Sequence, residues 1–162
     1  MEYARADPDQ TDGDGADLDL HLAHPTATAW FDRDLDCHYR NPTPSWGNGL
    51  TQSATLDVDD TDGAGPEKIS LQEPEDTTDL GAPYRVAVHY YSAEAGLFGD
   101  GTDYGTSTAT VRITFRGQAV EEFSRELNHW DLWEAALINW SPNDRSAEAL
   151  STPLMEYPPP GL

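Results

Sequence analysis

The stretch YRVAVHYY, residues 84–91, decides the fold of this chain. Its large apolar side chains recur at every second position, at Tyr84, Val86, Val88 and Tyr90. A period of two is the period of an extended strand that turns one face towards a core. The stretch is therefore predicted to be a β-strand.

Two further strands flank this one along the sequence. Leucines at positions 18, 20 and 22 alternate with Asp17, Asp19 and His21, which indicates a half-buried strand whose polar face meets solvent or an ion. Residues 108–115 are rich in β-branched side chains, which favour strands. The residues Arg116-Gly117-Gln118 that follow are typical of a tight hairpin turn.

Residues 119–140 fit two interpretations. Phe123, Leu127 and Trp130 fall at helical spacing, and the glutamates and alanines of this region favour a helix. The alternative is a hairpin with a turn at Asn128-His129, because a strand leaving residue 118 is naturally followed by an antiparallel partner. We favour the hairpin. The predicted fold class is all-β, an antiparallel β-sandwich.

The two ends of the chain differ in composition from the middle. Residues 1–16 are predicted to be a disordered acidic leader or linker. Their run DPDQTDGDG resembles extracellular calcium repeats, but the inserted Thr11 breaks the ligand spacing. Residues 143–162 include three consecutive prolines and are predicted to be a flexible Pro-rich tail. The sandwich domain is assigned to residues 17–142.

The charge of the chain limits the classes of partner that it is expected to bind. The chain has 30 acidic and 9 basic residues, a formal net charge of −21. Nucleic acids and anionic membranes both require Lys and Arg, so neither is an expected partner. No apolar run approaches the roughly 20 residues of a transmembrane segment, and the N-terminus lacks the regions of a signal peptide. The single cysteine, Cys37, excludes an internal disulfide and thiolate zinc clusters.

The densest acidic feature is LDVDDTDGAGPE, residues 56–67. Carboxylates this close repel one another unless a cation neutralises them, and calcium takes six to eight oxygen ligands. The EF-hand template fails here, because Asp62 stands where it needs glycine and Lys68 where it needs glutamate. We expect Asp17 and Asp19, on the strand at residues 17–22, to lie across from this loop. The candidate calcium ligands are Asp17, Asp19, Asp57, Asp59, Asp60, Asp62 and Glu67.

No catalytic motif stands out. The five histidines form no HExxH or HxH pair, and His21 and His89 are each expected to hydrogen-bond a neighbouring side chain. The serines lack a GxSxG setting. Exposed aromatic rings could instead stack on sugars, and the candidate ligand-binding residues are Trp30, Trp46, His89 and Tyr91. The chain is predicted not to be an enzyme.

Several motifs together resemble the YfaP-type family of bacterial domains of unknown function. They are DLDLHL at residues 17–22 with His24-Pro25, DCHYRNPTPSWG at 36–47, LDVDDTDG with GPE at 56–67, and the 84–91 strand. The resemblance spans roughly residues 16–142 and implies an immunoglobulin-like or pre-peptidase-like sandwich in exported or lipid-anchored proteins, with no established catalysis. It also supports the hairpin at 119–140. Ala64 departs from the aromatic expected at that position.

These observations lead to three functional hypotheses. The first is a non-catalytic, calcium-stabilised extracytoplasmic module for surface structure, adhesion or recognition, with a surface protein or a glycan as partner. The second is a carbohydrate-binding module. The third is a metal-dependent hydrolase that uses His21 or His89 beside the acidic cluster.

Overall fold

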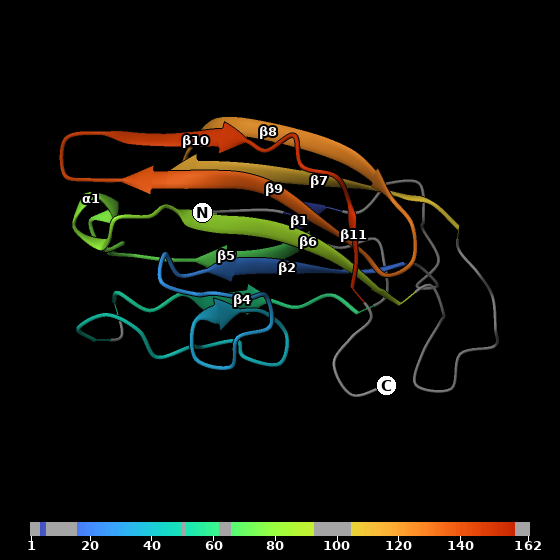
Figure 1. The fold of residues 1–162 in the computed structure, drawn as a ribbon, viewed down its shortest axis with the longest axis horizontal. Helices are drawn as coiled ribbons and strands as arrows, with labels where there is room; N and C mark the ends of the chain where they lie inside the picture. Colours follow the sequence, from blue (N-terminus) through green and yellow to red (C-terminus); the bar gives the residue numbers. More distant parts are fainter. Residues whose placement is uncertain (1–3, 6–15, 50, 62–65, 93–104, 158–162) are drawn as a thin grey trace.

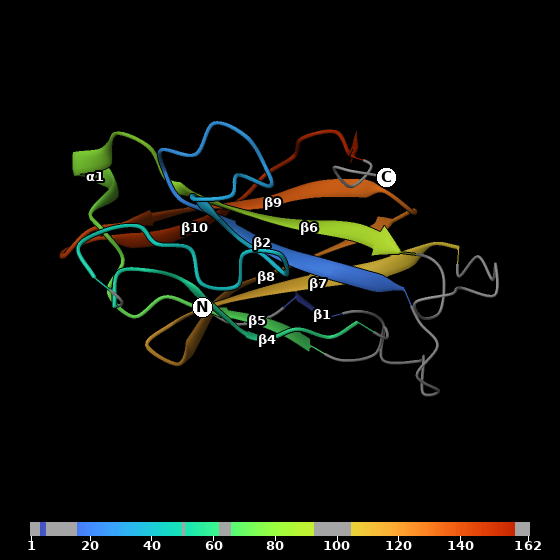
Figure 2. The same ribbon diagram turned by 90° about the horizontal axis from the view of Figure 1, so that it is seen from below.

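The computed structural model describes residues 4–5, 16–49, 51–61, 66–92 and 105–157. Antiparallel strands dominate these residues and form two sheets, which lie as two layers in Figure 2. The one helix in the described ranges, α1 (Thr77–Leu80), has four residues. No described helix is long and apolar enough to cross a membrane.

The first sheet has five strands in the order β4-β5-β1-β7-β8. The strand bounds are β4 (Thr55–Val58), β5 (Pro66–Ser70), β1 (Ala4–Arg5), β7 (Ser107–Phe115) and β8 (Gln118–Leu127). The predicted turn between β7 and β8 is confirmed: Phe115 pairs with Gln118. The two loop residues, Arg116 and Gly117, have φ of 54° and 78°, which is the backbone that a two-residue hairpin of right-twisted strands requires.

The second sheet runs in the order β10-β9-β6-β2-β3, with β11 also paired to β9 (Figure 1). The strand bounds are β10 (Arg145–Ala149), β9 (Asp131–Trp140), β6 (Tyr84–Ser92), β2 (Asp17–Ala23), β3 (Asp36–Cys37) and β11 (Met155–Glu156). The strands predicted at 84–91, 18–22 and 108–115 are thus confirmed.

The main core lies between the two sheets. The alternating leucines of β2 meet Val86 and Val88 of β6, and from the other layer Ile69, Val111 and Ile113 close the core. Each such side chain contributes about 1.5–3 kcal/mol when fully buried. The period of two recognised in the sequence is therefore the period of this interface.

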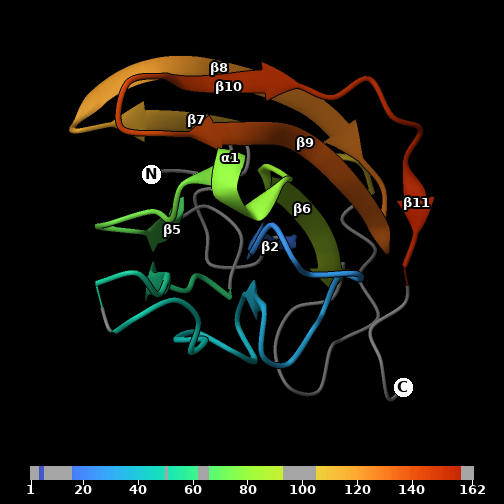
Figure 3. The same ribbon diagram turned by 60° about the vertical axis from the view of Figure 1, so that its left-hand side comes forward.

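The opposite face of the second sheet, called here the outer face, is also covered. Residues 27–35 and the chain around β11 pack over it, with Trp30, Leu132 and Tyr157 in a second apolar cluster. Figure 3 shows β11 and the segment that follows β2 beside this sheet. The polar face of β2 was expected to meet solvent or an ion, and solvent is wrong, because Asp19 and His21 lie beneath this cover.

The region 119–140 contains strands, and the helical interpretation is wrong. The hairpin interpretation is right about both strands and wrong about their pairing. β8 pairs with β7, whereas β9 pairs with β6, β10 and β11. The turn at residues 128–130 therefore passes from one sheet to the other, so that each strand satisfies its backbone with a partner in its own layer.

The predicted tails are more ordered than their composition suggests. β10 and β11 occupy successive stretches of one edge of β9, so residues 145–156 are not a flexible tail. In the predicted leader, Ala4 and Arg5 form β1 between β5 and β7. Backbone pairing with a sheet edge orders these segments despite their small apolar content. The DPDQTDGDG run lies outside the described residues.

Candidate functional site

Three carboxylates from separate parts of the first 70 residues come together beside β2. One ligand oxygen from each of Asp19, Asp59 and Glu67 lies within 4.8 Å of the other two. Asp19 is on β2, Glu67 is on β5, and Asp59 directly follows β4. We call these residues the carboxylate group. Such a grouping could hold a metal ion.

Glu67 reaches the group because β5 turns alternate residues inward. Glu67 and Ile69 are both buried, and Glu67 is only 2% exposed. Its Oε2 accepts a hydrogen bond from the backbone N–H of Leu20 at 2.5 Å. Burial, followed by the nearby Asp19 charge, raises the pKa of Glu67 to about 10, because a charged carboxylate loses its hydration there.

Asp19 is the second buried acid, at 2% exposure. Burial raises its pKa to about 7; neighbouring His21 opposes the increase and Asp59 adds to it. Within the described ranges, Asp19 Oδ2 and Glu67 Oε1 have no hydrogen-bond partner. Buried polar atoms are normally satisfied, and together with Asp59 these two acids could hold a metal ion.

The other predicted ligands do not join the carboxylate group. Asp57 lies in a β-bulge between β4 and β5, where it accepts from Ser70 Oγ at 3.1 Å and lies 3.6 Å from Lys68 Nζ. The extra residue of a bulge changes which way the side chain points. Asp17 and Asp60 are described but are not members of the group. Asp62 lies outside the described residues.

A cluster of histidines lies on the outer face next to Asp19. His21 and His89 are completely buried and His38 is 2% exposed. His21 Nδ1 donates to Asp36 Oδ2 at 2.9 Å, and the ring of His38 stacks on that of His21 at 4.9 Å. Burial lowers the pKa of His38 and of His89 to about 4 in each case.

The expected hydrogen bond to a side chain is found for His21 but not for His89. The partner of His89 is the backbone carbonyl of Tyr157, to which its Nε2 donates at 2.6 Å. The sequence argument did not single out Asp36 or His38 as functional. Their signal was weak, because Asp36 begins the two-residue strand β3 and His38 directly follows it, and a strand this short shows no periodicity.

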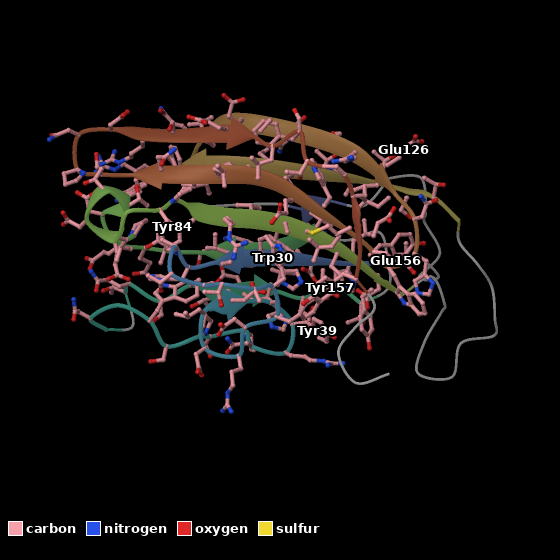
Figure 4. All side chains as sticks on the ribbon, in the orientation of Figure 1. Trp30, Tyr39, Tyr84, Glu126, Glu156 and Tyr157 are labelled. Carbon is pink, nitrogen blue, oxygen red and sulfur yellow. The ribbon has the colours of Figure 1, made fainter. Side chains whose placement is uncertain are left out.

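The aromatic residues proposed to bind sugars are largely buried. Trp30 is 6% and Trp46 5% exposed, and Trp30 Nε1 donates to Glu134 at 3.0 Å. His89 has no exposed surface. Tyr91 is half-buried against Tyr39. In the view of Figure 4, Trp30 and Tyr157 lie at the β2–β6 part of the second sheet, and Tyr39 lies below β2. These rings cover the sheet, so Trp30 and Trp46 present no flat platform to a sugar.

The geometry therefore defines a half-buried acid site that opens to solvent through Asp59, which is exposed. The cluster of buried histidines adjoins it. No family model, curated protein or solved structure matches this chain.

Proposed function

We propose that this chain is a calcium-binding, non-catalytic β-sandwich module of the extracytoplasmic space, serving surface structure, adhesion or recognition. The observation that carries the proposal is that one oxygen each of Asp19, Asp59 and Glu67 lie within 4.8 Å of one another, although Asp19 and Glu67 are buried. The immunoglobulin-like or pre-peptidase-like class and the export of the protein rest on the resemblance to YfaP-type domains.

The ligand chemistry supports calcium. All members of the carboxylate group supply oxygen, which is the ligand that calcium and other hard cations prefer. The exposed side of the group leaves room for the waters and backbone carbonyls that complete a shell of six to eight oxygens. The strong negative charge of the chain, −21, also concentrates divalent cations at its surface.

The proposed ion has a structural role. The three carboxylates belong to β2 in one sheet, to β5 in the other, and to the segment after β4. An ion held by them joins both layers at one point. Because it binds the folded chain alone, it stabilises the fold by about 2.7 kcal/mol at a hundredfold excess over Kd.

Thermal unfolding in EDTA and in millimolar calcium tests the proposal. We expect calcium to raise the Tm of the wild type and to leave that of Asp59→Asn unchanged. Asp57→Asn is the matched control, since it removes a nearby carboxylate that lies outside the group. It should keep the full calcium response. An unchanged wild-type Tm, or an equal loss in both variants, would contradict the proposal.

A further inference from the structure

Three side chains on the outer face of β2 and β6 each end in an unpaired atom. The atoms are His21 Nε2, His89 Nδ1 and Asp19 Oδ2, and none has a hydrogen-bond partner in the part of the chain that the structure describes. Asp19 and His89 face each other directly across the two strands, and His21 lies two residues further along β2. All three residues are at least 98% buried.

The hydrogen bonds on the far sides of the two imidazoles fix which nitrogen carries the proton. A carbonyl oxygen only accepts, so His89 Nε2 donates to Tyr157 and the proton lies on Nε2. The Asp36 carboxylate likewise holds the proton of His21 on Nδ1. In the neutral rings the unpaired nitrogens are therefore lone pairs. Carboxylate and carbonyl partners of this kind orient metal-binding histidines in proteins.

The distance between Asp19 and His89 suits a shared ion. His89 Nδ1 lies 3.8 Å from Asp19 Oδ2, which is too long for a hydrogen bond. Two ligands bonded to zinc at about 2.0–2.1 Å lie about 3.4 Å apart at a tetrahedral angle and about 4.1 Å apart when opposite. The observed separation falls between these limits.

We propose that His89 Nδ1 and Asp19 Oδ2 bind a second metal ion, of the zinc class, and that water on this ion donates a hydrogen bond to His21 Nε2. A nitrogen–oxygen ligand pair suits zinc better than calcium. The water accounts for His21, whose nitrogen lies outside any set of three described ligand atoms within 4.8 Å. Asp19 would then bridge this histidine site and the proposed calcium site.

A cavity adjoins the histidine cluster. It has a volume of about 400 Å³ and is lined by Phe31, His38, Asn41 and two arginines, Arg33 and Arg40. The ring of Phe31 contacts the rings of His21 and His89 at centroid distances of 4.7 and 5.3 Å. Phe31 therefore both lines this cavity and contacts the two histidines.

Titration of the full chain with zinc in excess calcium tests this inference, with cobalt as the spectroscopic probe. We expect zinc to bind with calcium present, and His89→Gln to weaken zinc by about tenfold or more. His21→Gln should weaken zinc less. The control is His129→Gln, which removes an exposed histidine and should bind zinc as the wild type does.

The outcome is separable from that of the proposed calcium site. Asp59→Asn should lose the calcium response and keep zinc, whereas Asp19→Asn should lose both. If Asp59→Asn loses zinc binding and His89→Gln keeps it, zinc binds in the carboxylate group. That result would overturn the inference and leave the calcium proposal intact. Absence of zinc binding by the wild type would also overturn it.

A measurement on the wild type keeps the test decisive if a histidine variant fails to fold. Crystals soaked in zinc should give an anomalous peak at the zinc edge about 2.0–2.1 Å from His89 Nδ1. A peak that lies only between Asp59 and Glu67, or no peak at all, would contradict the histidine site.

Discussion

The carboxylate of Glu67 on β5 accepts the backbone N–H of Leu20 on β2, so an acid of one sheet satisfies the free edge of a strand in the other. β3 pairs with β2 only at Leu22 and Ala23, which leaves the preceding residues of that edge without a strand neighbour in the described structure. Glu67 thus has a structural bond as well as a proposed ligand role, and substitution can separate the two.

Glu67→Gln should keep the structural bond and lose the ion. The amide oxygen still accepts from Leu20, and no charge is buried, so the metal-free free energy of unfolding should be at least that of the wild type. The increase in the free energy of unfolding that calcium gives the wild type, about 2.7 kcal/mol at a hundredfold excess over Kd, should be absent. Chemical unfolding in EDTA and in calcium measures both. Glu67→Ala should cost about 1–3 kcal/mol in EDTA, because the Leu20 N–H loses its acceptor.

The stability of the protein should fall in acid because of His38. Burial lowers its pKa to about 4 from 6.5, so between these values the unfolded chain binds more protons than the folded chain. The contribution of His38 to the free energy of unfolding is therefore complete above pH 6.5. It is lost as the pH falls towards 4, by an amount on the order of 2–3 kcal/mol. The charged or titratable groups acting on this ring are His21, Asp36, Arg40 and His89.

Unfolding free energies measured from pH 4 to pH 7.5 check this prediction. His38→Gln should show a shallower decline than the wild type across that range. His129→Gln, which removes an exposed histidine, should decline as the wild type does. Equal slopes for wild type and His38→Gln would show that other groups cause the acid sensitivity.

Asp36 should be the most costly polar residue to remove from the outer face. Its Oδ2 accepts from His21 Nδ1 at 2.9 Å and from the Phe31 N–H at 2.7 Å. Asp36→Ala leaves both donors buried and should cost about 3–5 kcal/mol. Asp36→Asn keeps an acceptor for one of them and should cost less. Urea denaturation ranks the variants, and the exposed Asp34→Ala should leave stability unchanged.

Arg116→Asn should stabilise the protein. Arg116 holds a left-handed backbone, with φ of 54°, which costs a side chain such as arginine about 1–2 kcal/mol and costs asparagine less. We expect a gain of about 0.5–1 kcal/mol in the free energy of unfolding, measured by urea denaturation. Arg116→Ala is the control, since it removes the arginine without favouring this backbone. A loss of stability in the asparagine variant would refute the argument.

Much of the fold could be predicted because the strands carry their own signal. The alternation of leucines in β2 and of valines in β6 is local, and so is the turn at Arg116-Gly117. The partner of each strand is not local. β8 and β9 follow one another in sequence yet join different sheets, and nothing in their residues distinguishes this arrangement from a hairpin.

The sequence showed that the candidate site is acidic, but not which acidic residues form it. Asp57 and Asp59 are the same type of residue, and the bulge at Asp57 separates them in space. Asp36 and His38 could be recognised as part of the buried cluster only from the structure, because β3 is only two residues long. The burial of Trp30 depends on Tyr157, whose hydroxyl donates to the Trp30 carbonyl at 3.4 Å across 127 residues of sequence.

The short β3 has a consequence for self-association. A strand edge with free N–H groups is a template on which a second copy can add a strand. At Leu20 the side chain of Glu67 takes that position, and Asp19 and Asp59 lie beside it. A buried acid here acts as a gatekeeper against edge-to-edge aggregation, and a bound cation would hold it in place.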